Sequence, residues 1–416
     1  MSRPVIVFAG AVYPGQFGRL CDYLREAGLA ETYFLTTPGH RARNRDRGAH
    51  VLEFRPDGPI TDGTGYYYAA KPERSARIGR GLLEALRTLQ AQRPIDVVVA
   101  HSLWGAPHFL YGEIDAAIVS YIEFPSYRAH GWDPAYPPDA AQRMADRNTE
   151  MLHFHQALNS DLVLCPSHHA KRMFPEALQG RIEVQMEGFE IEPVPRAEPA
   201  AAPEPAVRPF TIGFAARDLS SAKGFDIYMR LAERIAAEAG PVPRFVAFGG
   251  AGVATYGYEE QWVAREYGGA VASFRDHLLR LHPRAAALVE FPGPLPYADF
   301  ARALGQVDLF LYPLRHGVAN WGLVEILARG GCVIAPDRGY AAELILDDVN
   351  GRLLPDGDEA WLQEIRALRA DPARRLRYGR AAQVLAREFR LEAVAPRYLR
   401  LFRQAVERRR ARLAQG

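Results

Sequence analysis

The sequence predicts an α/β protein with two doubly wound, Rossmann-like domains that face each other across a cleft. Three observations predict this fold. Short apolar segments alternate with amphipathic helical patterns in both halves of the chain. A proline-rich segment separates the halves. The length of 416 residues suits two domains, at roughly 100–200 residues per domain.

The apolar segments have the length and composition of parallel strands buried on both faces. Each contains four to eight residues rich in Val, Ile and Phe. In the first half we expect strands at Pro4–Ala9, Glu31–Thr36, Ile95–Ala100, Ala117–Ile122 and Leu162–Pro166. In the second half we expect them at Phe210–Ala215, Arg244–Phe248, Leu288–Phe291, Leu309–Tyr312 and Cys332–Ala335. Intervening segments such as Phe225–Glu238 and Tyr297–Leu304 have helical periodicity.

Proline recurs with Ala and Glu between Ile191 and Phe210. Because proline lacks an N–H and fixes φ, this stretch favours a linker, although a surface loop within one domain remains an alternative. We therefore predict an N-terminal domain at 1–190, a linker at 191–209 and a C-terminal domain at 210–388. A helical tail at 389–416, interrupted at Pro396, is expected to pack back on the N-terminal domain.

Composition excludes several classes of protein. Lys and Arg number 51 against 49 Asp and Glu, so the net charge of +2 argues against a general nucleic-acid binder. The three cysteines are far apart and form no CxxC pair, which excludes a disulfide framework and favours a reducing compartment. No apolar run approaches the roughly 18–20 residues that span a bilayer. We therefore expect a soluble, cytoplasmic protein.

Ligands of open α/β sheets bind outside the carboxyl ends of the strands, so loops after strands are the candidate site. A helix is predicted from about Asn320 to Gly330-Gly331. Its first N–H groups, at Trp321, Gly322 and Leu323, would form an anion site at the positive end of the helix dipole. Glu325 lies on the same helix face as Trp321. Its carboxylate could accept hydrogen bonds from ribose hydroxyls, or it could only interact favourably with the positive end of the helix dipole.

Two other loops carry candidate residues. Arg217 and Lys223 share one loop before Gly224, and two cations there suit a diphosphate, although solvated loop cations are commoner. His101 follows the strand expected at Ile95–Ala100 and could donate to a substrate hydroxyl or act as an acid or base. A structural histidine is the alternative.

Cofactor motifs are incomplete. The glycines at 10–18 and 249–252 do not form GxGxxG, which disfavours a nicotinamide cofactor. The pairs His153/His155 and His168/His169 are badly spaced for one ion, and Asp356-Gly357-Asp358 more plausibly caps a helix at Glu359–Leu368. We therefore expect no metal. The basic tail, with Arg403, Arg408, Arg409, Arg410 and Arg412, is either a solvated face or a weak contact with an anionic membrane surface.

At these residues the chain resembles the retaining nucleotide-sugar glycosyltransferases of family four, which have the two-domain GT-B fold. Phe214–Arg217 with Lys223-Gly224 resembles the family's arginine–lysine pair for the donor phosphates. Gly322–Gly331 resembles its donor helix, with Glu325 as the ribose carboxylate, and Asp347–Gly351 resembles the turn that follows. First-half resemblances are Pro14–Phe17, His101–Gly105, Glu123-Phe124 with Asp133-Pro134, and Glu187-Gly188.

One position departs from the family pattern. The family usually has two glutamates eight positions apart, and the position eight before Glu325 is Gly317. Arg315-His316 is unusual in this place. The resemblance is therefore to a branch that lacks the first glutamate, which commonly faces the sugar.

The resemblance implies a retaining, metal-independent transferase without a cofactor. It would move a sugar from a UDP- or GDP-sugar to a hydroxyl of a glycan or small-molecule acceptor, in glycan or glycoconjugate biosynthesis. The implied residues are His101, Arg217 and Lys223 for catalysis; Gly15, Gln16, Asn320, Trp321, Gly322, Leu323 and Glu325 for the donor; and Glu123, Tyr127 and Trp132 for the acceptor. Aromatic residues around the last three, including Tyr121 and Phe124, either stack on a ligand or pack their own loop. A non-catalytic nucleotide-sugar binder and a sugar-nucleotide epimerase remain alternatives.

Overall fold

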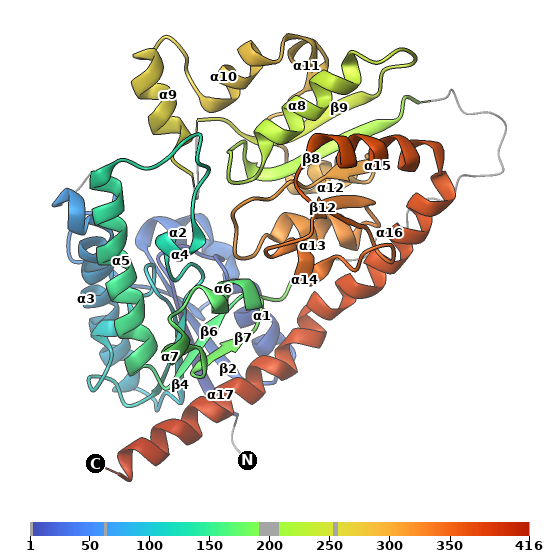
Figure 1. The fold of residues 1–416 in the computed structure, drawn as a ribbon. Helices are drawn as coiled ribbons and strands as arrows, with labels where there is room; N and C mark the ends of the chain where they lie inside the picture. The colour runs from blue at the N-terminus through green and yellow to red at the C-terminus, as the bar shows by residue number, and fades with distance from the viewer. Residues whose placement is uncertain (1–2, 62–64, 191–207, 253–256, 416) are drawn as a thin grey trace. The chain divides into compact units, whose positions relative to one another are not determined.

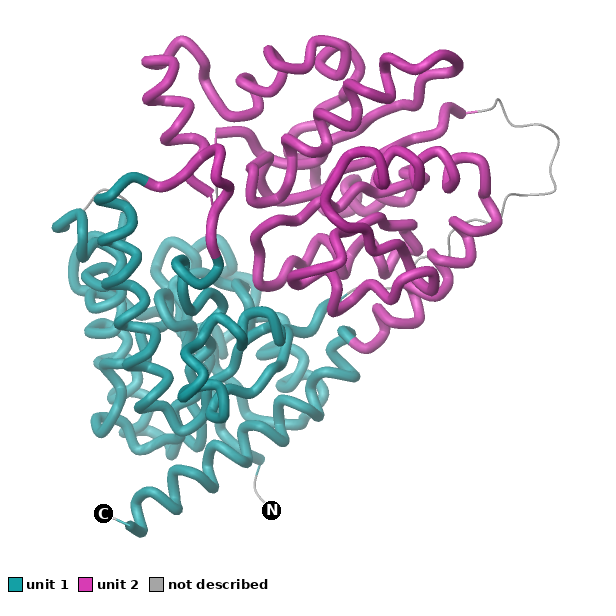
Figure 2. Tube along the Cα trace, in the orientation of Figure 1, with its two compact units in different colours: residues 1–130, 139–190, 389–416 teal, residues 131–138, 191–388 magenta. Residues whose placement is uncertain are grey.

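A computed structural model describes residues 3–61, 65–190, 208–252 and 257–415. The chain forms two compact units (Figure 2). Unit 1 consists of Met1–His130, Asp139–Glu190 and Phe389–Gly416, and unit 2 of Gly131–Pro138 and Ile191–Glu388. Each unit is built on a parallel sheet, which confirms the prediction of two Rossmann-like domains. Most of the expected linker, residues 191–207, lies outside the described residues.

The sheet of unit 1 has the strand order β3-β2-β1-β4-β5-β6-β7, all parallel. Its strands are β1 Val5–Ala9, β2 Glu31–Thr36, β3 Val51–Glu53, β4 Val97–His101, β5 Ala117–Tyr121, β6 Leu162–Cys165 and β7 Ile182–Val184. Winding reverses between β1 and β4, which makes their carboxyl ends the topological switch point. The sequence missed β3 and β7 because each edge strand has three residues with only one buried.

Helices of unit 1 cover both faces of this sheet (Figure 1). They are α1 Gly18–Glu26, α2 Pro38–Arg43, α3 Ala70–Gln90, α4 Tyr127–His130, α5 Ala140–Asn159, α6 His168–Arg172, α7 Glu176–Gln179 and α17 Leu391–Leu413. Short 3-10 turns occupy Arg45–Arg47, Tyr67–Ala69, Pro107–Phe109 and Arg387–Phe389. Among the described residues, no helix is both long enough and apolar enough to span a membrane.

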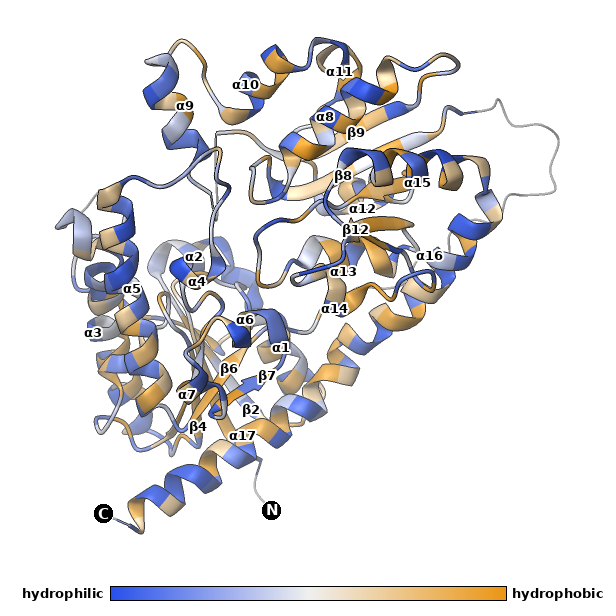
Figure 3. Ribbon diagram, viewed as in Figure 1, coloured by the Kyte–Doolittle hydropathy of each residue, from blue (hydrophilic) through white to orange (hydrophobic). Residues whose placement is uncertain are grey.

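Helix α17 brings the end of the chain back onto unit 1. Its apolar face, visible in Figure 3, joins the core of β1, β4, β5 and β6 through Leu391, Val394, Ala395, Tyr398, Phe402 and Ala405. The expected interruption at Pro396 is wrong, because one helix runs through it. Proline inside a helix costs roughly 3 kcal/mol, and the buried residues on both sides of Pro396 offset that cost.

The sheet of unit 2 has the strand order β10-β9-β8-β11-β12-β13, again all parallel. Its strands are β8 Thr211–Asp218, β9 Arg244–Gly250, β10 Val289–Glu290, β11 Leu309–Leu311, β12 Val333–Pro336 and β13 Arg352–Leu354. Its helices are α8 Phe225–Ala236, α9 Glu259–Tyr267, α10 Phe274–Leu281, α11 Pro283–Leu288, α12 Tyr297–Leu304, α13 Trp321–Ala328, α14 Ala341–Leu344, α15 Asp358–Ala370 and α16 Pro372–Ala386. Here the switch point lies between β8 and β11.

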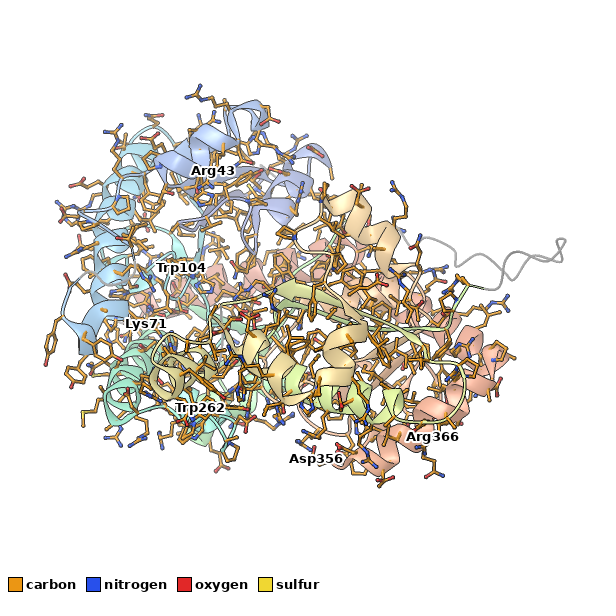
Figure 4. All side chains as sticks on the ribbon, turned by 90° about the horizontal axis from the view of Figure 1, so that it is seen from above. Arg43, Lys71, Trp104, Trp262, Asp356 and Arg366 are labelled. Atoms are coloured by element: carbon orange, nitrogen blue, oxygen red, sulfur yellow. The ribbon has the colours of Figure 1, made fainter. Side chains whose placement is uncertain are left out.

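The segment Gly131–Pro138 belongs to unit 2, although the predicted boundary placed it in the N-terminal domain. Its Tyr136 packs edge-on against Trp262, labelled in Figure 4, and against Phe274, with ring centroids 5.0 and 4.9 Å away. Its Asp133 forms an ion pair with Arg315 at 3.1 Å. These contacts come from residues more than a hundred positions along the chain, so local patterns could not assign the segment.

The prediction that an aspartate of Asp356-Gly357-Asp358 caps the N-terminus of α15 is also wrong. The helix begins at Asp358, and its N-cap Gly357 has no side chain to accept a bond. The two aspartates pair with arginines instead: Asp358 with Arg230 at 2.8 Å, and the exposed Asp356, labelled in Figure 4, with Arg338 at 2.7 Å.

Candidate functional site

Three chain segments of unit 2 converge at its switch point. Gly224 begins α8 with φ of 77°, and a Cβ there would lie 2.0 Å from the carbonyl oxygen of Pro313, which follows β11. At the start of α13, a Cβ on Gly322 would lie 3.8 Å from the carbonyl oxygen of Ala215 in β8. The loop after β8, the loop after β11 and the N-terminus of α13 therefore meet at one place.

The loop between β8 and α8 is held from two sides. The N–H and hydroxyl of Ser221 both donate to the carboxylate of Glu259, at 2.8 and 3.0 Å. On the other side, the backbone N–H groups of Arg315 and His316 donate to the carbonyl of Ala222. The loop is thus preorganised immediately before Lys223.

Glu259 was not predicted from the sequence. It is fully buried, and burial raises the pKa of its carboxyl, while the bonds from its own backbone N–H and from Ser221 lower it. Its partner lies 38 residues away, so no local motif marks the residue. Only the folded chain shows that this carboxylate supports the loop.

Arg217 and Lys223 do not share one loop as predicted, because β8 continues to Asp218 and only Lys223 lies in the loop that follows. The Arg217 side chain is 74% exposed, 3.8 Å from the buried carboxylate of Asp218. Lys223 is only 7% exposed. The structure therefore places one exposed arginine near the end of β8 and one buried lysine in the following loop.

The N-terminus of α13 differs from the prediction of three available N–H groups. The side chain of Asn320 caps the helix by accepting from the N–H of Gly322 at 3.0 Å. The N–H of Leu323 donates to the carbonyl of Asn320 at 3.2 Å. Two of the three expected donors are therefore engaged within the helix end, because the sequence carries its own N-cap. Trp321 is 41% exposed here.

Glu325 is a buried carboxylate with spare bonding capacity. Burial raises the pKa of its carboxyl, and the Arg329 guanidinium, 3.6 Å away, opposes that shift. Its Oε2 atom is buried without a hydrogen-bond partner among the described residues. Arg329 is itself held by the carbonyl of Glu325 and the hydroxyl of Tyr297. A buried acceptor oxygen without a donor in the protein is suited to accept a hydrogen bond from a hydroxyl group of a ligand.

The loop before α13 contains Gly317, the position where the family pattern usually has its first glutamate. Arg315 donates to both carboxylate oxygens of Asp226 and pairs with Asp133, so its role is to join these segments. Gly317 is buried, and a Cβ there would lie 3.1 Å from the side chain of Leu314. A side chain at the position that carries a glutamate in the resembling family would therefore require the Leu314 side chain to shift.

In unit 1, the loops after β1 and β4 also meet at the switch point. The N–H of Ala11 donates to the carbonyl of Trp104 at 2.8 Å, and a Cβ on Gly105 would lie 2.5 Å from the carbonyl of Ala9. Gly15 has φ of 48°, and a Cβ there would lie 2.7 Å from the carbonyl of Val12. Glycine is required at both positions by close backbone approach or by positive φ.

His101 at the end of β4 has a defined orientation. Its Nδ1 accepts from the N–H groups of Leu103 and Trp104, at 3.2 and 3.4 Å. In this geometry the ring proton lies on Nε2, which is buried without a hydrogen-bond partner among the described residues. Glu123 Oε2 is 3.6 Å from Nε2 and accepts from Gln16 at 3.3 Å. The structure thus brings together Gln16, His101 and Glu123.

The aromatic residues expected around an acceptor mostly pack within unit 1. Tyr121 is fully buried and donates to Glu187 at 2.5 Å, so it offers no stacking surface. Tyr127 packs against Phe124 and beneath Lys71, with the ammonium 4.3 Å from the ring centroid. Trp132 belongs to unit 2. In the part of the chain the structure describes, loop packing therefore accounts for Tyr121 and Tyr127.

One group among the described residues has the composition of a metal site. Single ligand atoms of Cys21, Asp22 and His50 lie within 4.8 Å of one another. The carboxylate of Asp22 already accepts from the hydroxyl of Tyr13 at 2.6 Å and contacts His50 at 2.8 Å. Burial raises the pKa of the Cys21 thiol to about 12, which disfavours the thiolate that binds metals. The three residues are therefore satisfied as an internal network.

Comparison with known proteins gives the family. A model described as "Glycosyl transferase family 4 group" matches residues 30–194, and one described as "Glycosyl transferases group 1" matches residues 201–384. A D-inositol 3-phosphate glycosyltransferase of Xylanimonas cellulosilytica is 36% identical over 118 residues. That match covers 28% of this chain and 27% of the relative.

Solved structures show the same fold. Sucrose-phosphate synthase from Thermosynechococcus elongatus has a TM-score of 0.70 at 16% identity, covering 97% of this chain and 99% of that one. Anabaena HepE in complex with UDP has a TM-score of 0.59 at 15% identity, covering 96% and 99%. The fold and the two family models define a glycosyltransferase-type protein with two Rossmann-like domains. Within that class, the chain belongs to the glycosyltransferases of the family-four type.

Proposed function

We propose that this protein transfers a sugar from a nucleoside-diphosphate sugar to an acceptor hydroxyl, with retention of the anomeric configuration. The observation that carries the proposal is the convergence of residues 217–223, at the end of β8 and in the loop after it, with α13 at the switch point of unit 2. The complex of Anabaena HepE with UDP supports a UDP-type donor. We assign the reaction to glycan or glycoconjugate biosynthesis.

The main chemical demand is to stabilise the departing diphosphate. Arg217 and Lys223 would bring two positive charges to it, and the burial of Lys223 would strengthen that interaction. Because these side chains supply the compensating charge, we propose that transfer needs no metal ion. The orphan oxygen of Glu325 would accept from the donor ribose.

His101 would act as a hydrogen-bond donor to the sugar rather than as a base. Two backbone N–H groups occupy its Nδ1, so only Nε2–H can reach a ligand. Gln16 and Glu123 would bind hydroxyl groups beside it. The acceptor proton would pass to the leaving phosphate, which removes the need for a protein base in retaining transfer.

The test is donor turnover by Lys223→Ala, with Lys171→Ala as the control, because Lys171 lies in unit 1 and donates to the carbonyl of Ile182. We expect Lys223→Ala to lower kcat/KM for the donor about 100-fold or more, and the control to keep it. Equal turnover in all three proteins would refute the phosphate role. NMR of the product gives the anomeric configuration, and activity in excess chelator tests metal independence.

A second candidate is a non-catalytic nucleotide-sugar binder, favoured by a glycine at position 317 in place of the family's first glutamate. A panel of UDP- and GDP-sugars separates the two functions. Donor binding, seen as a rise in Tm, without transfer or hydrolysis under any acceptor condition would favour the binder. Transfer to an acceptor would exclude it, and isomerisation of the donor without acceptor would indicate an epimerase.

A further inference from the structure

The basic end of α17 is tied to the amino-terminal edge of the unit 1 sheet. Three arginines of its last turns each pair with an acidic residue in or just before β5, β6 or β7. These pairs are Arg409–Asp115, Arg412–Asp161 and Arg408–Glu183, at 3.0, 2.9 and 3.2 Å. The basic tail is therefore not a uniformly solvated face.

Beside these pairs lies a cavity of about 310 Å³. Three guanidinium groups line it, from Arg181, Arg408 and Arg412, together with one carboxylate, Asp161, and the start of β6. Asp161 and Arg181 directly precede β6 and β7. In a parallel sheet these amino ends lie at the edge opposite the carboxyl end of β4, where His101 is located. The cavity is thus separate from the candidate sugar site of unit 1.

The charges around the cavity do not cancel. Asp161 is saturated by protein contacts: its side chain is 1% exposed, accepts from the N–H of Ile118 at 2.8 Å and pairs with Arg412. It serves as an anchor that orients the Arg412 guanidinium. Asp161 compensates Arg412 and Glu183 compensates Arg408, which leaves an excess of about one positive charge, that of Arg181, at the lining.

Each of these guanidinium groups also has donors to spare. A guanidinium has five N–H donors, and Arg181 uses one on the carbonyl of Leu158. Arg408 donates to Glu183, and Arg412 to the carbonyl of Asn159 and to Asp161. A ligand with several acceptor oxygens and at least one negative charge would satisfy both the charge and the donors.

We propose that this cavity binds a phosphate group, carried either by a small phosphorylated metabolite or by the headgroup of an anionic phospholipid. Both sources present negatively charged, non-bridging phosphate oxygens to the three arginines. The side chains of Arg408 and Arg412 are 37% and 51% exposed. A phosphate group can therefore reach the cavity from solvent or from a membrane surface. The site does not depend on the proposed transfer activity.

The test compares two double variants of the full chain. Arg181→Gln/Arg408→Gln removes two cavity charges and leaves the Arg412–Asp161 pair, which protects the fold. Arg403→Gln/Arg410→Gln is the matched control, because it removes the same charge from exposed positions of α17 outside the cavity. Both are measured with inorganic phosphate by calorimetry and hydrogen exchange, and with phosphatidylcholine vesicles containing or lacking phosphatidylglycerol by flotation.

A soluble ligand predicts that phosphate protects the amides around 160–163 and 180–182 in wild type and control. The cavity variant should then bind phosphate at least about tenfold more weakly. A lipid headgroup predicts instead that only binding to phosphatidylglycerol vesicles falls, again in the cavity variant alone. Phosphate bound in unit 2 would be unaffected by these substitutions. If the cavity variant and the control behave alike in both arms, the proposal is wrong.

Discussion

The ion pair between Asp133 and Arg315 predicts a measurable coupling that holds the segment Gly131–Pro138 on unit 2. The atoms are 3.1 Å apart, and the side chains are 8% and 22% exposed. At that distance two unit charges interact by about 5 kcal/mol with an effective dielectric constant near 20. Arg315 also serves Asp226 and is partly solvated, so we expect a net coupling of about 1–2 kcal/mol.

A double-mutant cycle of Asp133→Asn, Arg315→Gln and the double variant measures this energy by urea unfolding. Asparagine keeps the acceptor for the N–H of Ala135, so the substitution removes the charge and little else. Arg315→Gln alone should cost about 3 kcal/mol, since it leaves the buried Asp133 without its arginine and leaves Asp226 only the longer contact with Arg230 at 3.8 Å. Faster hydrogen exchange at 131–138 should accompany each single variant. A coupling below about 0.5 kcal/mol would refute the reasoning.

Three further outcomes follow, two from the candidate site and one from a buried histidine of unit 1. Glu259→Ala should release the loop before Lys223 and raise the KM for the donor about tenfold. Glu259→Gln can still accept a hydrogen bond from Ser221, so its KM should stay near that of the wild type. Identical behaviour of the two variants would contradict the anchoring role of Glu259. His101→Ala should lower kcat/KM about 100-fold, and His101→Gln, which keeps an N–H donor, should lower it less; equal losses would show that donation is not the function of His101. Burial lowers the pKa of His153 to about 4, so the unfolded chain takes up a proton that the folded chain refuses, and stability should fall as pH drops from 6.5 to 4. In urea unfolding experiments, His153→Gln should reduce the total loss of stability over this pH interval by about 3 kcal/mol at most, and an unchanged loss would contradict the assignment.

The central strands were predictable because each is an apolar segment that must be buried on both faces. Glu31–Thr36 matches β2 at both ends, and Tyr297–Leu304 matches α12. The edge strands β3 and β7 were not predictable, since one face of each is exposed and its pattern is weak. At Pro396 a local preference against helix was overridden by an apolar face that continues on both sides of the proline.

For the candidate site, the sequence alone determined which residue types follow which strands. Arg217, Lys223, His101 and Glu325 were predicted because a parallel sheet brings the carboxyl ends of its strands to one edge. The tertiary structure decided how each is held: Glu259 beneath Ser221, Arg315 between Asp226 and Asp133, and the Nδ1 of His101 bound to two backbone N–H groups. The local pattern of apolar and polar residues predicts where a strand or helix begins and ends. The contacts of Glu259 and Arg315 join residues that are distant in the sequence, and those of His101 depend on the orientation of its ring. Only the folded chain specifies such contacts.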